Sequence, residues 1–173
     1  FSSQSGALGL ALLEEATSRE LGFSSFVSLG NKADVSSNDL LEYWEDDPAT
    51  EVVAMYLEWF GNPRRFTEIA KRVGRKKPIL VVKSGRTAEG ARAATSHTGA
   101  LAGTDATITA FLRSCGVVPA DTIEELFDTA RAFDRCPLPA GRRVAIVTNA
   151  GGPAIMATNA CVGLSLEIAT LAP

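Results

Sequence analysis

Residues 51–82 read EVVAMYLEWFGNPRRFTEIAKRVGRKKPILVV, and they decide the fold because two apolar runs flank a single helical segment. The runs Glu51–Leu57 and Pro78–Val82 are short and nearly continuous, which is typical of strands buried on both faces. Between them, Gly61-Asn-Pro63 precedes a predicted helix over 64–73. A strand, a helix and a strand in this order predict a doubly wound α/β fold with a parallel sheet.

The same alternation continues on both sides of this unit. Thr122-Ile-Glu-Glu125 has the pattern of a capping box and marks one helix start. In the polar loop Gly30–Asn38, turn chemistry explains Asn31 and Asp34 better than ligand contact does. The sequence predicts further helices over 3–21, 39–46, 104–114 and 122–133, and short strands over 25–29 and 116–118.

A second unit follows the first. Cys136-Pro-Leu-Pro-Ala-Gly141 interrupts the alternation with two prolines and a glycine, so we place a domain boundary there. Beyond it we predict a strand over 143–148, a Gly-rich turn over 149–153 and a helix over 154–161. Both ends of the chain resemble interrupted elements, and we expect the chain to be part of a longer protein.

Composition excludes several classes of protein. The net charge of −3 and the 46% hydrophobic content are those of a soluble globular protein, without the basic surface that nucleic acid requires. No apolar run has membrane-spanning length and no basic segment precedes one, so we expect a cytoplasmic protein that does not enter membranes. Cys115, Cys136 and Cys161 lack metal-ligand spacing. We predict that they are reduced packing residues and that no metal site is present.

His97 is the only histidine of the chain, and it lies in a loop of small and basic residues over 83–103. A neutral imidazole is nucleophilic near pH 7, so His97 is the first candidate for catalysis. Glu58 ends the strand over 51–57, and His97 follows the strand over 78–82. Because the carboxyl ends of parallel strands share one edge, we expect Glu58 and His97 to meet there. A solvent-exposed loop histidine without a function is the alternative.

Two segments rich in Ser, Asn and Gly open predicted helices. Ser3-Gln-Ser-Gly6 begins the first helix, and Asn149-Ala-Gly-Gly152 precedes the helix of the second unit. Free N–H groups at such helix starts bind anions, although ordinary caps and tight turns use the same residues.

Four motifs together resemble those of one family. They are Ser3-Gln-Ser-Gly-Ala-Leu8, Tyr56-Leu-Glu58, Lys83-Ser-Gly-Arg-Thr87 with Ser96-His-Thr-Gly-Ala100, and Thr148-Asn-Ala-Gly-Gly-Pro153. In order and spacing they resemble NDP-forming acyl-CoA synthetases, in particular the ADP-forming acetyl-CoA synthetases, which are relatives of succinyl-CoA synthetase. The resemblance implies a flavodoxin-like ligase domain over 1–137. It also implies that residues 141–173 are the truncated beginning of a second, Rossmann-like or flavodoxin-like α/β unit.

The resemblance further implies an activity. Acyl-CoA, ADP and phosphate would be interconverted with acid, CoA and ATP through an acyl phosphate and a phosphohistidine at His97, with Glu58 orienting the imidazole. CoA and Mg²⁺-bound ATP or ADP would be held mainly by CoA-binding and ATP-grasp domains or subunits. The substrate would be a small acyl compound, and the protein could form a homo-oligomer. The implied phosphate-binding residues are Ser3, Ser5, Gly6, Asn149, Gly151 and Gly152, with Lys83 and Arg86 as second candidates.

Two other functions are weighed against this one. The same module occurs fused to a lysine acetyltransferase, where it serves as a regulatory ligand sensor, but such a module has no need of the nucleophile His97. A Rossmann-like dinucleotide binder is disfavoured because the chain lacks Gly-x-Gly-x-x-Gly with a downstream acid.

Overall fold

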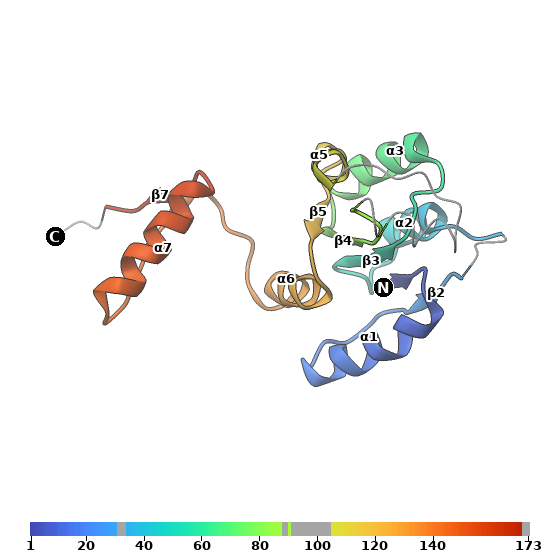
Figure 1. Ribbon diagram of the computed structural model, residues 1–173, viewed down its shortest axis with the longest axis horizontal. Coiled ribbons are helices and arrows are strands. Elements are labelled where there is room, and N and C mark those ends of the chain that lie inside the picture. The colour runs from blue at the N-terminus through green and yellow to red at the C-terminus, as the bar shows by residue number, and fades with distance from the viewer. Residues whose placement is uncertain (31–33, 88–89, 91–104, 171–173) are drawn as a thin grey trace. The chain divides into compact units, whose positions relative to one another are not determined.

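The computed structural model describes residues 1–30, 34–87, 90 and 105–170 (Figure 1). The chain divides into two compact units, one from Phe1 to Cys136 and one from Pro137 onward. Each unit has its own parallel sheet.

The first unit contains a five-stranded parallel sheet with the strand order β2-β1-β3-β4-β5. This is the flavodoxin-like order of a doubly wound fold, so the predicted fold class is confirmed. The strands are β1 (Ser2–Ser3), β2 (Val27–Ser28), β3 (Val53–Leu57), β4 (Ile79–Lys83) and β5 (Val118–Ala120). The described helices are α1 (Gly6–Ser18), α2 (Ser37–Asp46), α3 (Pro63–Val73), α5 (Asp105–Ser114) and α6 (Ile123–Arg135).

Helices cover both faces of this sheet. Alternate side chains of β3 point to opposite faces, so that Val53 and Met55 belong to one apolar cluster and Ala54 to the other. Helices α2, α3 and α5 cover the first face, and α1 and α6 cover the second (Figure 1). Large fully buried side chains fill both clusters, among them Trp44, Phe66, Leu112, Leu12, Leu126 and Phe127. Each contributes about 1.5–3 kcal/mol through burial.

Side-chain caps fix where the helices begin. Asn62 accepts hydrogen bonds from the N–H groups of Arg64 and Arg65, and Pro63 occupies the first helical position of α3. Thr122 accepts from the N–H of Glu125, as its capping pattern predicts. Helix α2 begins with a complete capping box formed by Ser36 and Asp39, two residues before the predicted start.

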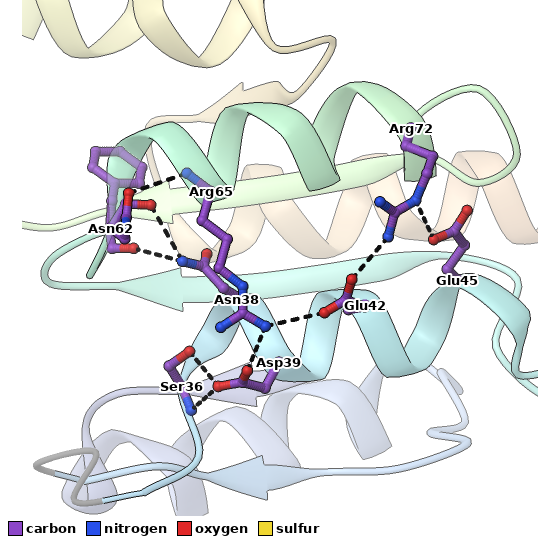
Figure 2. Close-up of polar contacts among 9 residues, drawn as sticks. Ser36, Asn38, Asp39, Glu42, Glu45, Asn62, Arg65 and Arg72 are labelled. Carbon is purple, nitrogen blue, oxygen red and sulfur yellow. Dashed lines mark hydrogen bonds and ion pairs between the residues drawn. The ribbon is translucent and has the colours of Figure 1, made fainter.

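An alternating row of charges joins α2 to α3. Figure 2 shows Arg65 between Asp39 and Glu42, and Arg72 between Glu42 and Glu45. Hydrogen bonds from both arginines lower the pKa of Glu42. Most of these side chains are partly exposed, so solvent screening keeps the contribution of each pair to stability small.

The second unit is a single strand-helix-strand element. It consists of β6 (Arg143–Val144), α7 (Gly151–Gly163) and β7 (Glu167–Ile168), and the two strands pair in parallel. The predicted strand over 143–148 ends at Val144, because the two residues of β7 are its only described partner. The predicted helix over 154–161 starts three residues early, so Gly151 and Gly152 belong to its first turn. No residue of α7 is buried.

The three cysteines are free, but only one is fully buried. Cys115 lies in the core between α5 and β5, whereas Cys136 is exposed at the end of α6 and Cys161 is half-buried on α7. The predicted packing role is therefore wrong for Cys136, whose sequence position at the boundary between the units explains its exposure.

Candidate functional site

The carboxyl edge of the first sheet carries the start of α1, Glu58 and Lys83. Strands β3 and β4 pair along their whole length, from Val53 with Ile79 to Leu57 with Lys83. Strand β1 lies on the other side of β3 and delivers the helix start to the same edge. Ser3, Ser5 and Gly6 thus lie at the end of β1 and in the turn that follows it, beside β3, which ends directly before Glu58. His97 and Asn31 lie outside the described residues.

The turn from β1 into α1 leaves two N–H groups available. The hydroxyl of Ser3 is buried, donates to the carbonyl oxygen of Ser5 at 2.7 Å and accepts from its N–H at 3.1 Å. The hydroxyl of Ser5 accepts from the N–H of Leu8 at 3.3 Å. Within the described part of the chain, the N–H groups of Gly6 and Ala7 have no hydrogen-bond partner. Ser3 therefore shapes the turn, and Gly6 and Ala7 provide the exposed donors.

The backbone after β3 is held by Gln4, which the sequence analysis did not identify. Its side-chain oxygen accepts from the N–H groups of Glu58 and Trp59 at 2.8 and 3.0 Å. The Gln4 side chain is 6% exposed, so these hydrogen bonds are shielded from water. The Glu58 side chain is half-buried, and among the described residues its carboxylate has no hydrogen-bond partner.

Lys83 lies beside Glu58 at the end of β4. Its Nζ donates to the carbonyl oxygen of Ser84 and lies 6.0 Å from the centroid of the Phe60 ring. Burial lowers the pKa of Lys83, the negative charge of Glu58 opposes this shift, and the positive charge of Arg86 adds to it. Lys83 thus supplies a partly shielded positive charge at this edge.

Arg86 has a different environment. Gly85 has φ of +68°, a conformation that glycine adopts without strain, and it turns the chain directly after β4. Arg86 then forms ion pairs with Asp105 and Asp121, and its guanidinium donates to the hydroxyl of Thr109 at 2.8 Å. Burial lowers its pKa, but the hydrogen bonds to the two aspartates outweigh burial and raise it. Arg86 therefore joins β4 to α5 and to the turn before α6.

The second predicted helix start lies in the other unit. Ala150 is the N-cap of α7 and makes no side-chain hydrogen bond there, while the Thr148 hydroxyl accepts from the N–H of Ala150 at 3.1 Å. Asn149, Gly151 and Gly152 are exposed. Within the described residues, the N–H groups of the two glycines have no partner.

Nothing in the described part of the chain requires the residues at these helix starts to be glycine. A Cβ built on Gly151 or Gly152 would meet nothing within 4 Å, and one on Gly6 would meet only the Ser28 hydroxyl at 3.8 Å. None of the three has a positive φ. Their small size therefore leaves room for a group that approaches from outside the chain.

Membrane-spanning helices and clusters of metal-ligating side chains are both absent from the described part of the chain. No helix there combines the length and apolar character that a membrane span needs. The side chains described also include no group of three or more His, Cys, Asp or Glu that could hold a metal ion.

Known proteins match the chain along nearly its whole length. The family model of the succinyl-CoA ligase like flavodoxin domain matches residues 1–133. A 4-hydroxybutyrate–CoA ligase (ADP-forming) of Nitrosopumilus maritimus is 48% identical over 171 residues, which are 98% of this chain and 24% of that protein. The alpha subunit of acetate–CoA ligase (ADP-forming) I of Pyrococcus furiosus is 50% identical over 158 residues, which are 91% of this chain and 34% of the subunit.

A solved structure agrees in fold as well as sequence. It is the dinucleotide forming acetyl-coenzyme A synthetase 1 of Ca. Korarchaeum cryptofilum in complex with phosphate and ADP. It matches with a TM-score of 0.90 and 40% identity, over 99% of this chain and 38% of that one. The chain therefore spans less than two fifths of each of these three proteins.

Proposed function

The chain belongs to the family of succinyl-CoA ligase like flavodoxin domains, and on this premise we propose that it is the phosphohistidine-bearing module of an ADP-forming acid–CoA ligase. The observation that carries the proposal is the carboxyl edge of the first sheet. There the N–H groups of Gly6 and Ala7, which have no partner among the described residues, lie on the segment beside β3, the strand that directly precedes Glu58. A helix N-terminus suits an anion, and a carboxylate without a hydrogen-bond partner in the described part of the chain suits an imidazole N–H.

The proposed reaction has three transfers. A phosphate oxygen attacks the acyl carbon of acyl-CoA, the C–S bond breaks, and CoA leaves as the thiol after taking up a proton. A His97 nitrogen then attacks the phosphorus of the acyl phosphate, the P–O bond breaks, and the acid leaves as its carboxylate. Finally a terminal oxygen of ADP attacks the phosphohistidine, and the P–N bond breaks to release ATP and the imidazole.

Glu58 and the helix starts have separate roles in the second transfer. Glu58 accepts a hydrogen bond from the N–H of the other ring nitrogen of His97, which fixes the tautomer and stabilises the positive charge that develops. The N–H groups of Gly6 and Ala7 bind the phosphoryl oxygens, and the α1 dipole contributes about 0.3–2 kcal/mol for the negative charge. Lys83 adds positive charge. Arg86, whose charge is paired with Asp105 and Asp121, stabilises the backbone at this edge of the sheet.

The helix start at Gly151 and Gly152 provides a second phosphate-binding site in this proposal. Two exposed glycine N–H groups and the absence of a side-chain cap support that role. The reaction also needs groups that bind CoA and the Mg²⁺ complex of the nucleotide. We assign these to further domains or subunits, because the ADP-forming relatives are longer than this chain.

Intact mass measurement tests this function. The complete protein is incubated with Mg-ATP as wild type, His97→Ala and Glu58→Gln, and each sample is measured before and after acid treatment. We expect one acid-labile phosphate on the wild type and none on His97→Ala. Glu58→Gln should take up phosphate about 10²–10⁴ times more slowly, because a neutral amide neither fixes the tautomer of the imidazole nor stabilises its developing charge.

Two results would contradict the proposal. Phosphate on His97→Ala equal to that on the wild type would place the phosphoryl acceptor elsewhere. A wild type that binds nucleotide but takes up no phosphate would instead favour a regulatory module, such as that of an acetyltransferase fusion.

A further inference from the structure

We propose that Gln4 is a positioning residue for Glu58, acting through a buried side-chain amide that fixes the backbone from which the Glu58 carboxylate extends. The inference rests on the proposed function, because positioning matters only if Glu58 orients the histidine. It adds to that function a residue whose own side chain contacts no reacting atom.

All four hydrogen-bonding positions of the Gln4 amide are used. The oxygen accepts from the N–H groups of Glu58 and Trp59, and Nε2 donates to the carbonyl oxygen of Trp59 and to the Ser37 hydroxyl, each at 2.9 Å. An amide has two acceptor sites and two donor hydrogens, so this side chain is fully satisfied. A fully satisfied and buried amide holds its neighbours in one arrangement.

A second buried amide holds the other end of the same segment. Asn38 is 2% exposed, and its Nδ2 donates to the carbonyl oxygens of Phe60 and Asn62 at 3.5 and 3.3 Å. Figure 2 shows Asn38 reaching from α2 to Asn62 at the start of α3. Ser37, the neighbour of Asn38, accepts from Gln4. Residues 58–62 are thus held at each end by a side-chain amide, one bonded to Ser37 at the start of α2 and the other belonging to the next residue, Asn38.

The location of Gln4 links two parts of the site. It lies between Ser3 and Ser5, in the turn that presents the N–H groups of Gly6 and Ala7. Its backbone N–H also donates to the carbonyl oxygen of Tyr56 at 3.2 Å, two residues before Glu58. One tetrapeptide therefore provides the helix start for the phosphate and holds the backbone of the glutamate, so displacement of either part changes the distance between them.

The segment could have been anchored without Gln4. The β3–β4 ladder ends at Leu57, and an N–H beyond a strand end commonly binds water at a surface. Here the N–H groups of residues 58 and 59 instead bind a side chain that is 6% exposed. Burial of an amide is unfavourable by itself, and we infer that it is kept because the Glu58 backbone must stay in one place.

The test uses the complete protein with Gln4→Met, which keeps the length of the side chain and removes its hydrogen bonds. We expect hydrogen exchange of the amides of Glu58 and Trp59 to accelerate at least about tenfold. Phosphorylation of His97 at saturating Mg-ATP should slow about 10–100-fold with an unchanged KM for ATP, because misplacement of a catalytic group affects the chemical step. Ser37→Ala removes only one acceptor and should give smaller shifts in both measurements.

A double-mutant cycle separates positioning from general destabilisation. In a Glu58→Gln background, Gln4→Met should cause less than about a twofold further loss of rate, because both changes remove the same function. Thr17→Val, at the exposed end of α1 far along the helix from Gln4, is the control and should leave exchange at residues 58 and 59 and the rate unchanged.

The outcomes are distinguishable. Exchange rates at residues 58 and 59 that stay at wild-type values in Gln4→Met overturn the inference, whatever the phosphorylation assay gives. Losses of rate that multiply fully in the double mutant overturn it as well, since Gln4 would then not act through Glu58. A wild type that takes up no phosphate overturns the proposed function. Hydrogen exchange at residues 58 and 59 does not depend on phosphorylation, so the two failures can be told apart.

Discussion

Helices α1 and α7 begin in different ways but present the same donors. In α1, the Ser5 cap binds the N–H of the third helical residue, Leu8, and the first two N–H groups have no partner among the residues that the structure describes. In α7, Ala150 provides no cap, and the third residue is Pro153, which has no N–H. Within the described ranges, each helix therefore has two N–H groups without a partner in its first turn. In α1 the third donor is capped, and in α7 proline removes it.

The surroundings of the two helices differ more than their first turns. Helix α1 packs Leu12 and Ala16 into the core beside a five-stranded sheet. Helix α7 has no buried residue and is accompanied by two short strands. The difference shows that the first unit fixes the direction of its own donors, whereas the second unit contributes little apolar burial to hold its helix in place.

The largest expected effect compares the apolar faces of these helices. Leu12 is 1% exposed and Ile155 is 65% exposed. Leu12→Ala should lower the free energy of unfolding by about 2–5 kcal/mol, because it leaves a cavity in the core. Ile155→Ala should change it by less than about 0.5 kcal/mol. Urea denaturation followed by far-UV circular dichroism measures both, and an equal loss for the two variants would show that α7 is buried in solution.

Much of the first unit could be predicted because its signals are local. The buried strands β3 and β4 are continuous apolar runs, and both were predicted to within two residues of their observed ends. Thr122 caps its helix through a residue three positions away. Such patterns need no knowledge of distant residues.

The missed features depend on distant partners. Gln4 looks like an ordinary polar turn residue in the sequence. Its hydrogen bonds to residues 33 to 55 positions away bury its side chain and let it hold the backbone after β3. The ion pairs of Arg86 with Asp105 and Asp121 were not predicted either, because these partners lie 19 and 35 positions away, and its candidate role in phosphate binding stays a prediction. Strand β6 is shorter than its apolar run because strand length depends on the neighbour available for pairing. The roles of His97 and Glu58 stay predictions.

The second prediction concerns α2, whose start has the fullest cap and therefore contrasts most with α7. The Ser36 hydroxyl and N–H donate to Asp39 at 2.6 and 2.8 Å, and with the Arg65 ion pair they lower the pKa of Asp39 to about 2. Since the folded pKa lies below the ordinary 3.8, the stabilisation is complete above that pH and disappears as the pH falls through about 2.

Asp39→Asn should therefore lower the free energy of unfolding by about 1 kcal/mol at neutral pH, a value that allows for the partial exposure of the carboxylate. The difference from wild type should shrink as the pH falls below 3.8 in urea denaturation. Asp46→Asn on the same helix, with an 85% exposed side chain, is the control and should show a smaller difference. A cost for Asp39→Asn that does not change with pH would contradict the role assigned to the carboxylate.

The smallest expected effect on stability gives the sharpest test of the comparison. Ala150→Ser would place a hydroxyl at the N-cap of α7, where a cap normally binds the N–H of the second or third helical residue. Because the third residue is Pro153, the hydroxyl can bind only the N–H of Gly152. We expect the free energy of unfolding of α7 to rise by about 0.5 kcal/mol, seen as slower hydrogen exchange at Gly152.

In the complete protein, phosphorylation of His97 should nevertheless slow, because the cap occupies a donor assigned to the phosphate. Ala150→Gly, which adds no acceptor, should slow neither process, and a capped variant that transfers phosphate at the wild-type rate would remove Gly152 from the site.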